Sequence, residues 1–123
     1  MSINAPAKAP AFCKVQVRFM LNDEIALGSG KVELLAAIAE TGSIAAAGRK
    51  MNMNYRRAWL LVETMNRCFM SPLVVSCKGG NHGGGAEVTE LGQQVITLYQ
   101  ELLATIQSQT QQQQQQLLAL LKP

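Results

Sequence analysis

The sequence has few of the residues from which catalytic or metal sites are built. Histidine occurs once, as His82 in a glycine-rich run, so no Ser-His-Asp or Cys-His-Asp order can be proposed. The three cysteines are odd in number and lack C-x-x-C spacing, which argues against a disulfide framework and a zinc site. His82 and Cys77 together fall short of a tetrahedral ligand set. We therefore expect no active site, no metal and no cofactor.

Long apolar runs are also missing. No stretch is long enough to span a membrane, and the N-terminus lacks the apolar core of a signal peptide. Unpaired cysteines indicate a reducing compartment. A length of 123 residues suits one domain that folds without disulfides or metal. These features predict a soluble, cytoplasmic protein with no membrane partner.

The stretch from 43 to 67 predicts two helices that meet at a sharp corner. Ser43 can cap a short helix, and after a break at Asn52 and Met53 a second cap, Asn54, opens a longer one. Small residues at 45–48 keep the first helix thin, so the second can cross it closely. The longer helix carries one apolar stripe toward the domain, formed by Ala58, Val62, Met65 and Phe69. This arrangement is typical of a helix-turn-helix.

Positive charge is concentrated in the same part of the chain. Residues 43–78 hold six basic residues and one acidic residue, a local charge of +5, whereas the remainder holds five basic and seven acidic residues, or −2. Tyr55, Arg56 and Arg57 crowd the first turn of the longer helix, where a recognition helix meets base edges in the major groove. The asymmetry indicates a polyanionic partner, and double-stranded DNA is the first candidate. Trp59 could stack on a sugar or phosphate edge, but its position at the margin of the apolar stripe favours partial burial against the domain.

The N-terminal third predicts a tail, two short strands and a helix. Residues 1–11 are unpatterned and predict a disordered tail. Apolar and polar residues alternate over 12–20, as in a strand with one buried face, before a turn at Asn22 and Asp23. Residues 24–27 can form the returning strand. The helix that follows ends at Gly42 and should pack across the helix-turn-helix with a stripe of Val32, Leu35, Ile38 and Ala39.

After the longer helix the pattern predicts a β-hairpin. Ser71 and Pro72 stop the helix, residues 73–77 form a β-branched strand, and five glycines follow within 79–86. Three helices followed by a hairpin make a winged helix. In one interpretation the wing touches sugar and phosphate through Lys78, His82 and the backbone of Gly79 and Gly80. In the other it is only an unconstrained hairpin tip. No Lys-Ser or Lys-Thr pair follows the glycines, so we discount a P-loop.

The C-terminal part predicts a long helix with an apolar surface too wide for one small domain. Thr89 can cap this helix, and two apolar bands run along it to about residue 106. The bands favour a homodimer in the manner of a coiled coil, the alternative being a helix wholly buried against its own domain. The glutamines of 107–123 either continue the helix or fray. The expected interface residues are Leu91, Val95, Leu98, Tyr99, Leu102 and Ile106.

Two segments together carry a family resemblance. The run LLAAIAETGSIAAAGRKMNMNYRRAWLLVETMN and the later GGNHGGGAEVTELG resemble the N-terminal DNA-binding domain of the ModE family of molybdate-responsive transcription regulators. The helix-turn-helix is also similar to that of LysR-type regulators. The resemblance implies a dimer formed through the first and last helices on a palindromic operator. It places DNA contacts at Ser43, Ala45, Asn54, Tyr55, Arg56, Arg57, Lys78, Gly79, Gly80 and His82.

The resemblance covers residues 12–106 and includes no counterpart of the family's oxyanion-binding domains. We therefore expect that this polypeptide does not sense molybdate itself and that a separate effector-sensing protein is a further partner. The predicted fold is mainly α with small β elements, a winged helix-turn-helix at 12–106 with a dimerisation helix from about 90. The predicted function is sequence-specific transcription regulation. The alternative is a winged-helix module for protein–protein interaction, which has no need of an arginine-crowded recognition helix.

Overall fold

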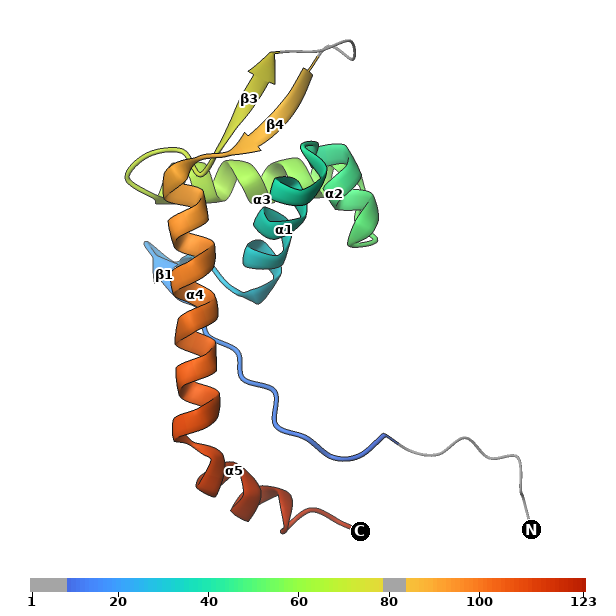
Figure 1. Cartoon of the computed structure of the whole chain (residues 1–123), viewed down its shortest axis with the longest axis vertical. Coiled ribbons are helices and arrows are strands. Elements are labelled where there is room, and N and C mark those ends of the chain that lie inside the picture. The colour runs from blue at the N-terminus through green and yellow to red at the C-terminus, as the bar shows by residue number, and fades with distance from the viewer. Residues whose placement is uncertain (1–8, 79–83) are drawn as a thin grey trace, which may run out of the picture.

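A computed structural model describes residues 9–78 and 84–123. In these residues the chain forms five helices and two separate two-stranded antiparallel sheets, in the order β1-β2-α1-α2-α3-β3-β4-α4-α5 (Figure 1). The predicted fold class, mainly α with small β elements, is confirmed.

The first hairpin forms where the sequence predicts it. Strand β1 (Phe19–Leu21) pairs with β2 (Glu24–Leu27) through a two-residue turn. Both turn residues, Asn22 and Asp23, lie in the left-handed region, with φ of 49° and 68°. Two-residue hairpin turns of this hand suit the right-handed twist of the strands, and Asn and Asp tolerate the conformation better than most residues.

The strand predicted over 12–20 is wrong for most of its length. Residues 9–18 run without regular structure, and only the last residues of the prediction enter β1. The alternation itself persists, because Cys13, Val15 and Val17 are half-buried while their neighbours are exposed. A covered face produces a two-residue period, whereas a strand also needs a neighbouring backbone for its hydrogen bonds. Of the predicted tail, residues 9–11 have no regular structure and 1–8 lie outside the described residues.

Three helices build the core with the caps that the sequence predicts. They are α1 (Ser29–Thr41), α2 (Ile44–Lys50) and α3 (Tyr55–Cys68). Ser43 Oγ accepts a hydrogen bond from Ala46 N at 3.1 Å, and Asn54 Oδ1 accepts one from Arg57 N at 2.8 Å. These side chains satisfy backbone donors that a helix start leaves free.

Helix α1 is central, because it packs against α2, α3, α4 and β4. Its Leu34, Leu35 and Ile38 are fully buried. Ala39, predicted on the buried stripe, is exposed, whereas Leu34 and Ala37, outside the predicted stripe, are buried. The close α2–α3 crossing is confirmed at Gly48, where an added Cβ would lie 3.2 Å from Ala58 Cβ.

The second hairpin is longer than predicted. Strands β3 (Val74–Lys78) and β4 (Gly84–Val88) pair in register from Val74↔Val88 to Lys78↔Gly84. The predicted tip of 79–86 is therefore too long by three residues. Glycine is needed at position 85 for close packing rather than for backbone flexibility, because a Cβ there would lie 2.9 Å from Gly42 O. Ala86 N also donates a hydrogen bond to that oxygen, at 3.0 Å.

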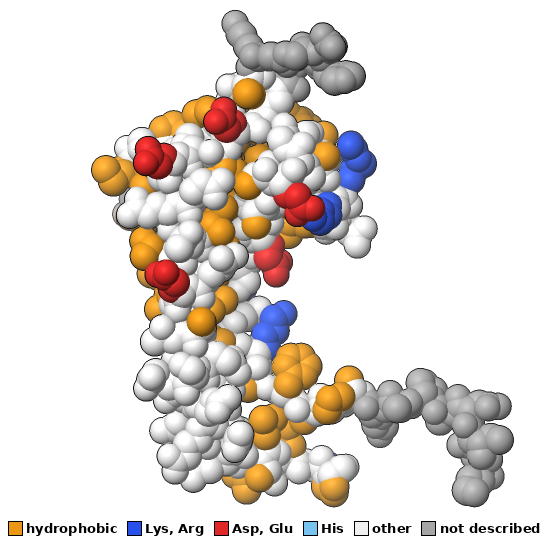
Figure 2. Space-filling model, viewed as in Figure 1, with side chains coloured by type: hydrophobic (Ala, Val, Ile, Leu, Met, Phe, Trp, Pro, Cys, Tyr) orange, Lys and Arg blue, Asp and Glu red, His pale blue; other side chains and the backbone are white. Residues whose placement is uncertain are grey.

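The C-terminal helices extend away from the three-helix unit (Figure 1). Helix α4 (Glu90–Gln109) starts at the predicted cap, where Thr89 Oγ1 accepts from Gly92 N at 3.0 Å. After a break at Thr110 the glutamines form a further helix, α5 (Gln111–Leu118), so they continue the helical structure rather than fray. The far end of this arm is mostly white in Figure 2, in keeping with its many uncharged polar residues, and carries scattered apolar patches.

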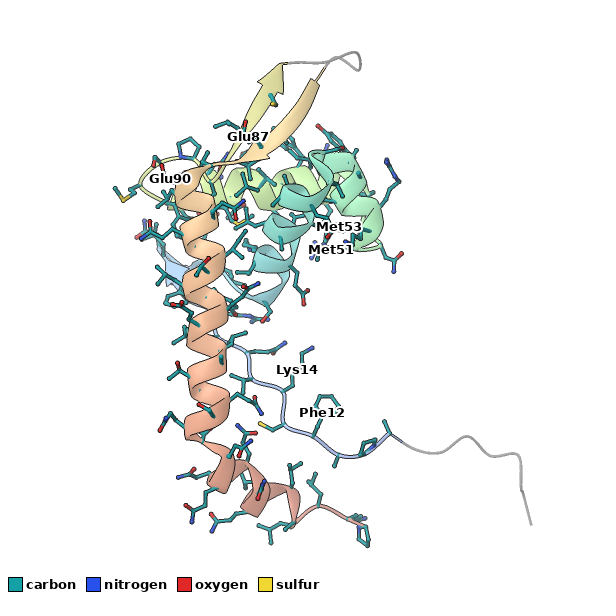
Figure 3. The ribbon with its side chains drawn as sticks, viewed as in Figure 1. Phe12, Lys14, Met51, Met53, Glu87 and Glu90 are labelled. Atoms are coloured by element: carbon teal, nitrogen blue, oxygen red, sulfur yellow. The ribbon has the colours of Figure 1, made fainter. Side chains whose placement is uncertain are left out.

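The extended segment before β1 runs on the side of this arm. Figure 3 shows Phe12 and Lys14 on this segment, well separated from Met51 and Met53 at the α2–α3 corner. Cys13 and several α5 residues line one small pocket, so the segment and α5 lie close together. Within the described ranges, no helix combines the length and the apolar character that crossing a membrane requires.

Candidate nucleic-acid interface

The start of α3 is the most exposed part of the helix-turn-helix. Asn54 fixes its first turn, and Tyr55, Arg56 and Arg57 all face solvent. The helix is nevertheless anchored, because Ala58, Val62 and Met65 are buried on its opposite side as predicted. A rigid helix with an exposed N-terminal turn has the form needed to enter a groove.

The structure does not place the three residues of this turn in one cluster. Tyr55 lines a cleft toward the β3–β4 hairpin, whereas Arg57 lines a different cleft beside the start of α1. Successive residues of a helix point about 100° apart, so a crowded turn in the sequence is spread around the axis. Arg56 lies between the two directions and lines neither cleft.

The cleft beside α1 is electropositive. It has a volume of about 240 Å³, and Arg18 and Lys31 line it together with Arg57. Burial lowers the pKa of Lys31, and Arg57 and Arg18 lower it further, while Cys68 and Glu24 act in the opposite direction. Sequence reasoning missed Arg18 and Lys31, because both lie outside the charged stretch and only the fold brings them to Arg57.

Ion pairs neutralise part of the positive charge of residues 43–78. Lys50 Nζ lies 2.6 Å from Glu40 Oε2, and Arg67 pairs with both Glu24 and Glu63. In the described part of the chain, Arg49, Arg56 and Arg57 have no carboxylate within ion-pair distance. Lys and Arg side chains lie over α2 at the edge of the face shown in Figure 2. The uncompensated charge is therefore concentrated at the α2–α3 corner.

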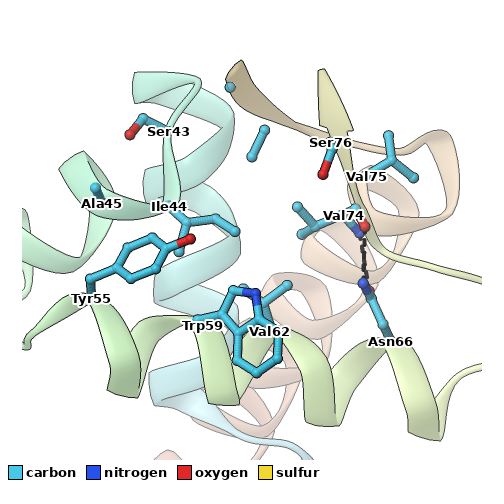
Figure 4. Close-up of a pocket in the computed structure, with 12 residues that line it drawn as sticks. Ser43, Ile44, Ala45, Tyr55, Trp59, Val62, Asn66, Val74, Val75 and Ser76 are labelled. Carbon is cyan, nitrogen blue, oxygen red and sulfur yellow. Dashed lines mark hydrogen bonds between the residues drawn. The ribbon is translucent and has the colours of Figure 1, made fainter. Parts of the chain in front are cut away.

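A second cleft separates α3 from the β3–β4 hairpin, which we call the wing (Figure 4). This wing cleft has a volume of about 420 Å³. It brings Ser43 and Ala45 of the α2 start, both predicted to lie near the DNA backbone, together with Tyr55. Its remaining lining residues are Ile44, Trp59, Val62, Asn66, Val74, Val75, Ser76, Gly85 and Ala86.

Trp59 is partly buried, as predicted, and the rest of its side chain is open to solvent. Its side chain is 45% exposed and lines the wing cleft one turn after Tyr55, which is 56% exposed. Trp59 is on the wing side of α3. It lines the cleft that separates this helix from the wing, so the wing does not cover it. Leu60, 44% exposed on the outer face of α3, was missed, because a leucine gives no signal of exposure in the sequence.

Asn66 holds the wing to α3. Its Nδ2 donates to Val74 O at 2.9 Å, while its Oδ1 accepts from Leu73 N at 2.8 Å and from Val74 N at 3.2 Å. One side chain thus satisfies backbone groups at the beginning of β3. Sequence reasoning missed this residue, since a lone asparagine in a helix carries no pattern.

Asn66→Ala should lower the free energy of unfolding by about 1 to 2 kcal/mol, because backbone groups near the start of β3 lose their partner. Urea unfolding followed by circular dichroism measures this change. The control is Gln94→Ala, which removes an amide from an exposed site on α4 and should change the free energy by less than about 0.5 kcal/mol. Equal effects of the two substitutions would mean that Asn66 does not hold the wing.

Gly79, Gly80 and His82 lie outside the described residues, and Lys78 is placed by its backbone as the last residue of β3.

Helix α4 divides its apolar residues between the core and the surface. Val95 and Tyr99, both predicted at a dimer interface, are instead 8% and 3% exposed within this chain. Tyr99 Oη donates to Val17 O at 2.7 Å and lies 3.2 Å from Ser29 Oγ, so the extended segment and α1 cover it. Leu98 is 55% exposed and, with Leu102, lines an apolar groove of about 390 Å³. The alternative of a helix wholly buried against its own domain therefore holds for Val95, Ile96 and Tyr99 but not for Leu98.

The corner of α2 and α3, the wing and the long helix α4 define a winged helix-turn-helix protein. Solved structures share this fold: the DNA-binding domain of CbnR in a complex with DNA matches with a TM-score of 0.52 at 17% identity, over 68% of this chain and 91% of that one. VV2_1132, a LysR family transcriptional regulator, matches with a TM-score of 0.51 at 16% identity, over 68% of this chain and 27% of that one.

Sequence relatives agree with the resemblance to ModE. The chain is 44% identical over 73 residues to the molybdenum-pterin-binding protein MopB of Rhodobacter capsulatus, covering 59% of this chain and 27% of that protein. It is 37% identical over 83 residues to the molybdenum transport protein ModE of Azotobacter vinelandii, covering 68% and 31%. The DNA-binding transcriptional dual regulator ModE of Escherichia coli is 40% identical over 77 residues, covering 63% and 29%. No family model matches the chain.

The chain thus carries a ModE-like helix-turn-helix domain, and the predicted resemblance is confirmed. Each of these three relatives is more than three times as long as the part that the chain matches.

Proposed function

We propose that this chain is a sequence-specific, DNA-binding transcriptional regulator that inserts α3 into the major groove. The observation that carries the proposal is the exposed first turn of α3, where Arg56 has no ion-pair partner among the described residues. Arginine is the residue that most often reads guanine, through two hydrogen bonds to its major-groove edge. The names of the relatives, which include a DNA-binding regulator, support the same function.

The two neighbouring arginines should have different roles. Arg56 projects outward from α3, where base edges would lie. Arg57 shares its cleft with Arg18 and Lys31, and three cations at one place suit a phosphate of the DNA backbone better than a base. The pair therefore offers a matched test, because both substitutions remove one arginine from the same helical turn.

Arg56→Ala should weaken binding by about 1 to 3 kcal/mol and relax the preference at one base pair of each half-site. Arg57→Ala should weaken all sequences alike and reduce the dependence of log K on log salt by about one ion. Selection of bound sites from random duplex DNA, followed by affinity measurements at several salt concentrations, tests both. If both variants bound the selected site as tightly as the parent, α3 would not be a recognition helix.

We further infer that the chain acts as a homodimer on a palindromic operator. Leu98 and Leu102 lie on an apolar groove with Phe19, Leu21 and Phe69, on the side of α4 that the domain leaves open. A second copy related by a two-fold axis would cover two such grooves at once. Symmetry in the selected DNA sites supports this inference, and single half-sites oppose it.

The second candidate is a winged-helix module that holds a protein partner, which the exposed Leu60, Leu98 and Met70 favour. The two candidates differ in their response to salt. A protein that neutralises several phosphates loses DNA affinity steeply as salt rises, whereas an interaction module shows weak binding to DNA at every salt concentration. In either case we propose a cytoplasmic, non-enzymatic protein, with a separate effector-sensing protein as a further partner and with 107–123 as an extension of the DNA-binding domain.

A further inference from the structure

The wing cleft is built from uncharged residues only. None of its twelve lining residues is Lys, Arg, Asp or Glu. One wall is the α3 face that carries Tyr55 and Trp59, and the opposite wall is β3, whose Ser76 hydroxyl points into the space (Figure 4). The positive charge lies elsewhere, at the α2–α3 corner and in the cleft of Arg57. The walls of this cleft therefore offer no charged side chain to whatever enters it.

The two aromatic rings have exposed area that the core does not use. Tyr55 and Trp59 are four residues apart, so they stand one above the other on one face of α3. They are 56% and 45% exposed, although the core around Ala58 and Val62 is closed. A half-exposed indole offers a flat apolar face and one N–H donor. Such a face fits the ring of a sugar or a nucleobase.

We propose that the wing cleft binds one DNA strand beside the groove that α3 enters, with a deoxyribose in contact with the indole of Trp59. The inference rests on the proposed function and adds the occupant of this cleft. A phosphate there would lack a cation, whereas the sugar between two phosphates is uncharged. Ser43, Ala45 and Tyr55 line the same cleft, so the strand can pass from the α2 start to the wing.

Trp59 is the single tryptophan of the chain, so its fluorescence reports on this cleft alone. Quenching by acrylamide, a neutral molecule that DNA phosphates do not repel, should be efficient in the free protein. On saturation with the selected duplex the Stern–Volmer constant should fall by at least about threefold, because the sugar covers the indole. Saturation is verified separately by the anisotropy of dye-labelled duplex.

DNA binding and the occupancy of the cleft give different results in these measurements. If the duplex does not bind at all, the proposed function fails. If it binds and the Stern–Volmer constant stays unchanged, DNA binding stands and the occupant of the cleft is wrong. Replacing each thymine of the duplex in turn by deoxyuracil should leave the affinity unchanged. If one replacement lowered the affinity of the parent but not that of Trp59→Ala, the indole would contact a thymine methyl group instead of a deoxyribose.

Two variants test the cleft from opposite walls. Trp59→Ala removes the stacking face, and Ser76→Phe fills the space from the wing while it retains Trp59. Each should weaken binding about tenfold for all sequences, and Trp59→Phe should restore most of the loss of Trp59→Ala. Met70→Ala, which removes a 93% exposed side chain outside the cleft, is the control and should bind as the parent does. If both Trp59→Ala and Ser76→Phe bound DNA as tightly as the parent, the proposal would be overturned. If Ser76→Phe does not fold, the affinity of Trp59→Phe and the quenching measurement test the proposal instead.

Discussion

Replacing Leu98 and Leu102 by glutamate should convert the proposed dimer into a folded monomer. Leu98 is 55% exposed in the single chain, and Leu102 is half-buried, so neither is essential to the core. In a dimer the same substitutions place four carboxylates in a desolvated apolar contact, which costs several kcal/mol. Sedimentation equilibrium should show the mass of one chain. Affinity for a palindromic site should fall at least about 100-fold, since two linked half-site contacts become one.

The matched control is Gln100→Glu with Ala104→Glu. These positions are exposed on another side of α4 and add the same charge per chain. The control should remain a dimer and lose only the small affinity that added negative charge removes from any DNA-binding protein. If the leucine variant remained a dimer with normal affinity, the contact between copies would lie elsewhere, and the groove beside Leu98 would have no part in it.

Gly92→Ala should destabilise the fold by about 3 kcal/mol, although alanine is the better helix former by about 1 kcal/mol. Gly92 lies in the first turn of α4, where the helix passes over the chain before β3. A Cβ there would lie 2.5 Å from Leu73 O and 2.6 Å from Val88 Cγ1. The first of these atoms belongs to the backbone and also accepts from Thr89 N at 2.8 Å, so it cannot move without loss.

The control for this prediction is Gly30→Ala, in the first turn of α1. A Cβ at Gly30 meets nothing within 4 Å, so the helix propensity of alanine should act alone and raise the free energy of unfolding by about 0.5 to 1 kcal/mol. Thermal or urea unfolding of the two variants gives the comparison. If Gly92→Ala were as stable as the parent, α4 would be free to move away from β3, and the wing would not be fixed to α4.

Local signals in the sequence were sufficient for most helices and turns. Ser43, Asn54 and Thr89 cap the helices that they were predicted to cap, because a capping side chain bonds to a donor only two or three residues away. The turn at Asn22 and Asp23 follows from the conformational tolerance of these two residues. The buried stripe of α3 follows from the helical period. Such features depend on neighbours in the chain, so they can be predicted without the fold.

Three features needed the tertiary structure. Residues 12–18 show the period of a strand but have no strand beside them, and whether a partner exists is decided elsewhere in the chain. Gly85 looked like part of a free loop, yet Gly42 O leaves no room for a side chain. Of the apolar bands of α4, Val95 and Tyr99 are covered by the chain itself, whereas Leu98 is not. Periodicity identifies an apolar face, but only packing decides what covers it.

The candidate site also has some features that the sequence predicts and others that depend on the fold. The sequence by itself determined that a capped helix begins with Tyr55, Arg56 and Arg57 and that charge gathers near it. Only the tertiary structure decided that Arg57 joins Arg18 and Lys31, that Arg67 is paired with Glu24, and that Trp59 opens into a cleft. Helix formation is governed by residues three or four positions apart. The environment of a surface side chain also depends on segments far away in the sequence, such as those of Glu24 and Arg67, which are 43 residues apart and come together only when the core forms.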